Sequence, residues 1–177
     1  MRTAEAIVRL ADWDRRNRYV YLKRDLGKVF NEAGNTLNQT LKRLKGKGVL
    51  VRAAHGVYVY ALSSRVGAAT IQEIALTLRR GEYVFESLES ALSQWGVISQ
   101  VPIDRITVMT TGSKGVSRTP YGTIEFVHTK LTPDQIRQGT LERPGQPLPI
   151  ATEAFALRNL RRTGRSAELL AERGSHE

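Results

Sequence analysis

Residues 34–60 of this chain read GNTLNQTLKRLKGKGVLVRAAHGVYVY. Over residues 36–45 the leucines recur at spacings of three and four, which predicts an amphipathic helix with one buried side. Two β-prone runs follow, at residues 49–52 and 57–60. The short link between them predicts a β-hairpin in which Gly56 takes a positive φ.

The side of this helix opposite the leucines carries amides and cations. Asn and Gln side chains can bond two edge atoms of adenine, Arg can bond those of guanine, and Thr or Lys can bond phosphates. This composition predicts a helix that packs on a core and faces a DNA groove. The residues expected to enter the groove are Asn35, Thr36, Asn38, Gln39, Lys42 and Arg43.

Upstream of this stretch, two further helices are expected. Apolar spacing predicts one from Thr3 to about Asp12 and another at about Lys23–Asn31, which Tyr19–Leu22 leads into. The chain therefore has two helices, a third helix with a polar outer face, and then a hairpin. This order of elements predicts a winged helix-turn-helix. The residues expected to hold DNA phosphates are Arg52 and His55 near the hairpin tip, with Arg15, Arg16, Arg18 and Lys23.

The charge distribution separates two parts of the 177-residue chain. The formal net charge is +10, from 27 basic and 17 acidic residues. Residues 1–65 carry 14 Lys/Arg and 5 Asp/Glu, a net charge of +9, whereas residues 66–177 carry only +1. A basic module joined to a neutral one is typical of a protein in which one part meets phosphate. We therefore expect a DNA-binding domain at 1–65 and a second domain at 66–177.

The second domain is predicted to be small and of the α+β class. The expected helices cover residues 68–79, 87–96, 153–160 and 166–172, and the expected strands 82–85, 106–110 and 122–128. Ser87 and Ser90 supply the frame of a helix capping box. The segments 111–121 and 137–147 are rich in Gly, Pro and charge and are predicted to be loops.

Several kinds of chemistry are not expected. The chain has no cysteine, which excludes disulfides and cysteine zinc sites, and its three histidines show no metal-ligand spacing. Residues 111–115 (TGSKG) lack the full spacing of a phosphate-binding loop. No nucleophile, base and orienting group come together. We expect no catalytic residues, metal or cofactor, and therefore not an enzyme.

No window approaches the roughly 20 apolar residues that a membrane-spanning helix needs. The first residues, MRTAE, include an acid and lack a long apolar run, unlike a signal peptide. These features predict a cytoplasmic protein that does not contact membranes.

Five short motifs, in this order along the chain, are similar to motifs of a known family. They are HGVY at residues 55–58, YV at 83–84, SLESAL at 87–92, GVISQVP at 96–102 and TPYGTIEF at 119–126. In this arrangement the chain resembles the AbiEi-type antitoxins of type IV toxin–antitoxin systems over most of its length to about Lys130. The resemblance implies a bacterial repressor of its own operon that binds inverted repeats in double-stranded DNA. It also implies a C-terminal domain that counteracts a nucleotidyltransferase-like toxin, with or without a stable complex.

Two other classes of function stay open. A protein-interaction module could inhibit a partner enzyme directly, with a basic surface that includes Arg158, Arg161, Arg162 and Arg165. An RNA-binding regulator is less well supported, because stacking aromatic residues do not cluster in the basic region.

Overall fold

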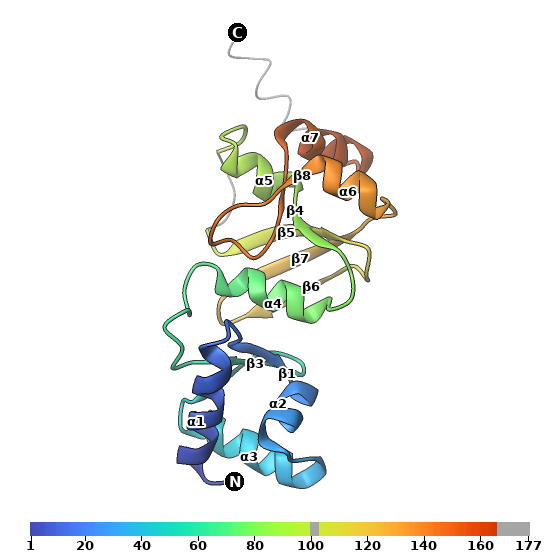
Figure 1. Cartoon of the computed structure of the whole chain (residues 1–177). Helices are drawn as coiled ribbons and strands as arrows, with labels where there is room; N and C mark the ends of the chain where they lie inside the picture. Colours follow the sequence, from blue (N-terminus) through green and yellow to red (C-terminus); the bar gives the residue numbers. More distant parts are fainter. Residues whose placement is uncertain (100–102, 166–177) are drawn as a thin grey trace. The chain divides into compact units, whose positions relative to one another are not determined.

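The computed structural model describes residues 1–99 and 103–165 (Figure 1). These residues form seven helices and two sheets, so the predicted α+β class is confirmed. The described chain divides into two compact units. Unit 1 holds Met1–Leu78 with Thr119–Tyr121, and unit 2 holds the rest, whereas the sequence prediction began the second domain at residue 66.

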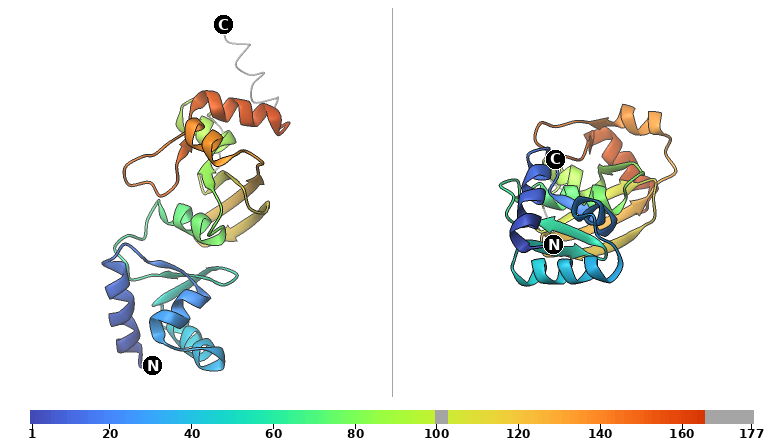
Figure 2. Two further views of the ribbon diagram at one scale, coloured as in Figure 1. Left: turned by 45° about the vertical axis from the view of Figure 1, so that its right-hand side comes forward. Right: turned by 60° about the horizontal axis from the view of Figure 1, so that its bottom comes forward.

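Unit 1 is built from helices around a small antiparallel sheet. Its elements are α1 (Thr3–Asp14), β1 (Val20–Leu22), α2 (Lys23–Phe30), α3 (Gly34–Gly46), β2 (Leu50–Ala54), β3 (Val57–Tyr60) and α4 (Thr70–Leu78). The strand order is β1-β3-β2. Helices α2 and α3 lie on one side of this sheet and α4 on the other (Figures 1 and 2). All four residues of β3 are therefore buried, as expected for a central strand covered on both faces.

The sequence interpretation of unit 1 was wrong at one element. Residues 19–22 were expected only to lead into the second helix, but residues 20–22 form strand β1, in which Val20 pairs with Val59. A run of three residues is too short to show the two-residue alternation that reveals a strand. The other predicted elements are found close to their expected bounds, including the β2–β3 hairpin with Gly56 at φ +69°.

Unit 2 holds a six-stranded mixed sheet with helices on one side of it (Figure 1). Its elements are β4 (Val84–Glu86), α5 (Leu88–Gln94), β5 (Arg105–Thr110), β6 (Gly115–Thr119), β7 (Gly122–His128), α6 (Pro133–Gly139), β8 (Thr140–Leu141), β9 (Ile150–Ala151) and α7 (Glu153–Arg162). The strand order is β6-β7-β5-β4-β9-β8. Strands β5 and β7 are parallel, as are β4 and β9, and β4 and β5 are antiparallel.

The core of unit 2 lies between this sheet and α5, α6 and α7. Phe85 of β4 and Phe155 of α7 stack with their ring centroids 5.9 Å apart. The last residue of α6, Gly139, is buried directly against the Phe155 ring. A Cβ added at Gly139 would lie 2.3 Å from a ring carbon, so α6 and α7 can pack this closely only with glycine here.

Both segments predicted to be loops contain regular structure. The first holds strand β6 at Gly115–Thr119, and the second holds the end of α6 and strand β8. The two strands are at the edges of the sheet, where mostly solvent-exposed side chains give no alternating apolar pattern. The predicted helix at residues 166–172 lies outside the described residues.

The predicted capping box at the start of α5 was also wrong. Ser87 is the N-cap residue, but its side chain bonds no amide of the first helical turn. Its buried hydroxyl instead accepts a hydrogen bond from Asn159 Nδ2 on α7, at 3.2 Å. The chain turns into the helix through Leu88, which has a φ of +57°, a left-handed conformation that is unusual for leucine.

Two ion-pair networks connect segments outside the sheet of unit 2 to its strands. Glu86, which is 1% exposed, accepts hydrogen bonds from Arg143 Nη2 at 3.0 Å and Gln94 Nε2 at 2.7 Å. Arg165, just after α7, donates to Glu125 Oε2 on β7 at 2.9 Å and to Glu89 Oε1 on α5 at 3.1 Å. Because Glu86 is almost completely buried, its carboxylate depends on Arg143 for charge compensation.

We expect Gly139→Ala to lower the free energy of unfolding by about 1–3 kcal/mol, the usual range for overpacking a core. The new methyl group would displace the Phe155 ring from its stack on Phe85. Chemical denaturation monitored by circular dichroism measures the change. Gly46→Ala, where an added Cβ meets nothing within 4 Å, is the control and should leave stability unchanged or raise it by up to about 1 kcal/mol, since alanine favours a helix more than glycine does. Equal stability of both variants would contradict the packing argument.

The pH dependence of stability should carry a contribution from Glu125. Hydrogen bonds from Arg165 lower the pKa of this carboxyl, burial opposes that effect, and Arg105 lowers the pKa further. A carboxyl whose pKa is depressed by folding stabilises the protein above its unfolded pKa, and this stabilisation is lost as the pH falls through the folded pKa.

Glu125→Gln is therefore expected to cost roughly 1.5–3 kcal/mol at pH 7, as for hydrogen bonds to charged groups. The difference in unfolding free energy between this variant and the unmodified protein should shrink below about pH 4.3, where an unperturbed glutamate protonates. Urea denaturation at pH 7, 5 and 3 measures it. A difference that is independent of pH would show that the ion pairs with Arg165 and Arg105 do not stabilise unit 2.

Candidate nucleic-acid interface

Helix α3 presents one side to the core of unit 1 and the other to solvent. Leu37, Thr40, Leu41 and Leu44 are buried. The six residues that the sequence placed on the opposite face, Asn35, Thr36, Asn38, Gln39, Lys42 and Arg43, are all exposed. The structure therefore brings together on one helix face the side chains that were expected to meet a groove.

These six side chains are not equivalent. At about 100° per residue, Asn35, Gln39 and Lys42 lie near the middle of the exposed face, and Asn38 lies toward one edge of it. Arg43 lies at its edge, next to the buried side of the helix, where it donates hydrogen bonds to the carbonyl oxygen of Met1 and to Thr40 Oγ1. The centre of the exposed face thus carries two amides and one lysine.

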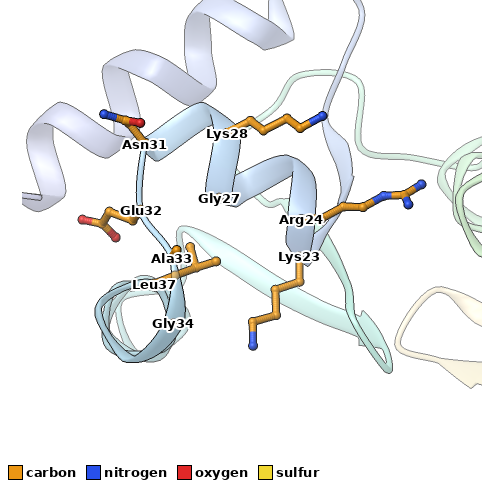
Figure 3. Close-up of a pocket in the computed structure, with 9 residues that line it drawn as sticks. All are labelled: Lys23, Arg24, Gly27, Lys28, Asn31, Glu32, Ala33, Gly34 and Leu37. Atoms are coloured by element: carbon orange, nitrogen blue, oxygen red, sulfur yellow. The ribbon is translucent and has the colours of Figure 1, made fainter.

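A concave surface that encloses about 750 Å³ lies between α2 and the start of α3 (Figure 3). Three cations from α2 line it together with the turn and the start of α3. Its residues are Lys23, Arg24, Gly27, Lys28, Asn31, Glu32, Ala33, Gly34 and Leu37. Of the cations, sequence reasoning named only Lys23. Arg24 and Lys28 were missed, although their four-residue spacing places them on one side of α2.

The single carboxylate of this concave surface is already bonded. Glu32 Oε1 lies 2.9 Å from the amino group of Met1, and the Glu32 side chain is 8% exposed. Burial raises the pKa of Glu32, but hydrogen bonds from Thr40 and the Met1 amino group and the nearby charge of Arg43 lower it by more. The net result is a lowered pKa, so the carboxylate stays ionised and forms an ion pair with the Met1 amino group. The remaining charges on the concave surface are the cations of α2.

Two glycines shape the α2–α3 connection. A Cβ at Gly27 would lie 3.0 Å from the carbonyl oxygen of Glu32 and 3.4 Å from a methyl of Leu37, so this glycine lets the helices approach closely. Gly34, the first residue of α3, has a φ of +55°, a left-handed conformation that favours glycine. The connection therefore depends on two small residues that fix where α3 begins relative to α2.

The β2–β3 hairpin carries the two phosphate-binding candidates predicted near its tip. Arg52 and His55 are both exposed, and Arg52 Nη2 lies 3.3 Å from His55 Nδ1. The register of the hairpin shifts between Arg52 and Ala54, which marks a bulge beside these side chains. Both residues are available to a partner that approaches the hairpin.

The cations before β1 differ in how far they are already neutralised. Arg15 forms an ion pair with Asp12. Arg18 lies 3.6 Å from Asp25 Oδ2 and is only partly exposed. The guanidinium of Arg16 lies over the Trp13 ring, 5.3 Å from its centroid. Arg15 and Arg18 therefore contribute less free positive charge than the sequence suggested.

No group of three or more His, Cys, Asp or Glu residues that could hold a metal ion occurs in residues 1–99 and 103–165. Residues 111–115 lead into strand β6 and not into a helix, as expected for a turn that is not a phosphate-binding loop. Nearby, His128 Nδ1 lies 2.7 Å from the carbonyl oxygen of Gly112. His176 lies outside the described residues. No helix in the described part of the chain is long and apolar enough to cross a membrane.

Comparison with known proteins places this α+β chain in a family. It belongs to DUF6088, a family of unknown function, which matches residues 22–139. A crystal structure of the Rv2827c protein from Mycobacterium tuberculosis shares the fold, with a TM-score of 0.59 at 15% sequence identity. The match covers 89% of this chain and 61% of that protein, so this chain spans less than two thirds of that protein. No curated protein matches the sequence.

Proposed function

We propose that the chain is a transcription regulator whose unit 1 binds double-stranded DNA as a winged helix-turn-helix. In this proposal α2 and α3 are the helix-turn-helix, α3 is the recognition helix, and the β2–β3 hairpin is the wing. The observation that supports it best is the exposed face of α3, where amides and a lysine project from a helix whose other side is held by buried leucines.

The central amides would supply sequence discrimination. In the major groove, a bidentate Asn or Gln pairs with the N6 and N7 atoms of adenine, and each such pair discriminates by about 1–3 kcal/mol. Asn35 and Gln39 lie one turn apart in this part of α3, with Lys42 one turn further on. Arg43 would have to release Met1 before it could contact a base.

The surrounding cations would supply affinity without discrimination, because phosphates are the same at every base pair. Lys23, Arg24 and Lys28 line the concave surface beside α3. Further phosphate contacts would come from Arg52 and His55 on the proposed wing and from Arg16. The ion-paired Arg15 and Arg18 would contribute more weakly. This arrangement separates the residues that read bases from those that hold the backbone.

The resemblance to AbiEi-type antitoxins extends the proposal to a biological role. The chain would repress its own operon from inverted repeats in the cytoplasm, and unit 2 would counteract a nucleotidyltransferase-like toxin. A toxin reading frame directly beside this gene would support that role. The DNA-binding proposal stands independently of it, because it rests on α2, α3 and the hairpin.

The first test compares binding to DNA from upstream of the protein's own gene with binding to a scrambled duplex of the same composition. The double variant Asn35→Ala/Gln39→Ala should lose about 1–3 kcal/mol of preference per amide, that is, roughly thirtyfold or more in the affinity ratio. Competition mobility shifts at two salt concentrations measure this ratio. Gln138→Ala, an exposed amide on α6, is the matched control. An unchanged ratio in the double variant would rule out α3 as the recognition helix.

The cations of α2 should behave differently from the amides. Arg24→Gln/Lys28→Gln is expected to weaken binding to both duplexes equally and to make the slope of log K against log salt shallower by about 2, or one per phosphate contact. Lys114→Gln/Lys130→Gln removes the same charge from exposed positions in unit 2 and controls for net charge. If both pairs changed the slope equally, the concave surface would have no special part in binding.

A further inference from the structure

Helix α7 of unit 2 carries a row of exposed arginines opposite its buried side. Phe155, Ala156, Asn159 and Leu160 pack into the core of unit 2. Arg158, Arg161 and Arg162, called here the α7 arginine face, are all exposed and lie within about 100° of one another around the helix. Thr152 caps the helix by accepting a hydrogen bond from the Phe155 amide at 3.3 Å, so the face is carried by a well-anchored element.

The fourth arginine of this region has a different environment. Arg165 is held by Glu125 and Glu89, which makes it part of the framework of unit 2. No carboxylate in the described part of the chain forms an ion pair with any residue of the α7 arginine face. The guanidinium of Arg158 lies 5.6 Å from the centroid of the Phe155 ring, a contact that orients the cation without neutralising it.

Helix-dipole stabilisation does not account for the whole face. Arg161 and Arg162 lie in the last turn of α7, where cations interact favourably with the helix dipole. Arg158 lies a full turn earlier, outside the range of that effect. The dipole therefore accounts for two of the three arginines and leaves the charge of Arg158 available to a partner.

We propose that the α7 arginine face contacts the phosphate backbone of double-stranded DNA, as a second and sequence-independent contact of the same chain. The inference rests on the proposed function of unit 1. The buried centres of protein interfaces are enriched in aromatic residues, whereas none of the large apolar side chains exposed in the described residues lies on α7. A phosphate backbone needs only cations, and the planar guanidinium matches phosphate well.

The test uses the full chain with Arg158→Gln/Arg161→Gln/Arg162→Gln. Fluorescence anisotropy at several salt concentrations gives the salt slope on the upstream and scrambled duplexes. We expect the slope to become shallower by about 2–3, since each lost phosphate contact accounts for about 0.9. Affinity should fall by the same factor on both duplexes, which leaves the specificity ratio unchanged. A variant with three Arg→Lys changes at these positions should keep the slope of the unmodified protein.

The matched control is Lys114→Gln/Arg118→Gln/Lys130→Gln, which removes the same charge from other exposed positions of unit 2. Equal slopes for the two triple variants, with thermal melts showing both folded, would overturn the proposal. Loss of binding to labelled poly-L-glutamate with duplex binding intact would also overturn it and favour an acidic protein partner. If the unmodified chain bound both duplexes equally, the proposed function of unit 1 would fail, but the slopes on the scrambled duplex would still decide whether α7 contacts phosphate.

Discussion

The burial of the leucine stripe on α3 is the constraint on which the proposed interface depends. Leu37, Leu41 and Leu44 are each at most 5% exposed and fix the rotation of the helix about its own axis. Each fully buried leucine contributes about 1.5–3 kcal/mol relative to an exposed one. A turn of the helix by one residue, about 100°, would expose these leucines and bury the amides, which would be left without hydrogen-bond partners. Core packing thus sets which side chains face outward.

Charge in unit 1 is organised by a second constraint, the placement of its few acids. Asp12, Asp25 and Glu32 each bond a nearby cation: Arg15, Arg18 and the amino group of Met1. The exposed pair of Arg15 and Asp12 stabilises little, since such pairs have a median of about 0–1 kcal/mol. These pairs also change the charge distribution of unit 1, because they cancel positive charge around the α1–β1 loop and at the α2–α3 turn. The excess positive charge of unit 1 is therefore concentrated on the solvent-facing sides of α2 and α3.

The sequence predicted those features that follow from local periodicity. The α3 face was predicted completely, since a repeat of three and four residues determines both the helix and its exposed side. Strands β1 and β6 were missed for different reasons: the first is three residues long, and the second is an exposed edge strand without alternating burial. Arg24 and Lys28 were missed because the concave surface they line forms only when α2 and α3 pack together. Tertiary contact, and not composition, distinguishes them from other surface cations.

The arginines around α7 show the same limit in unit 2. Arg165 follows Arg161 and Arg162 closely in sequence, and in a list of residues the three look equivalent. The fold separates them, because the chain after α7 brings Arg165 against carboxylates of β7 and α5. Its charge is used within unit 2, where neutralising Arg165 would leave two glutamates less well compensated. Arg158, Arg161 and Arg162 form no ion pair with a carboxylate of residues 1–99 and 103–165. An arginine can be assigned to structure or to binding only when the carboxylates within its reach are known, and that knowledge requires the fold.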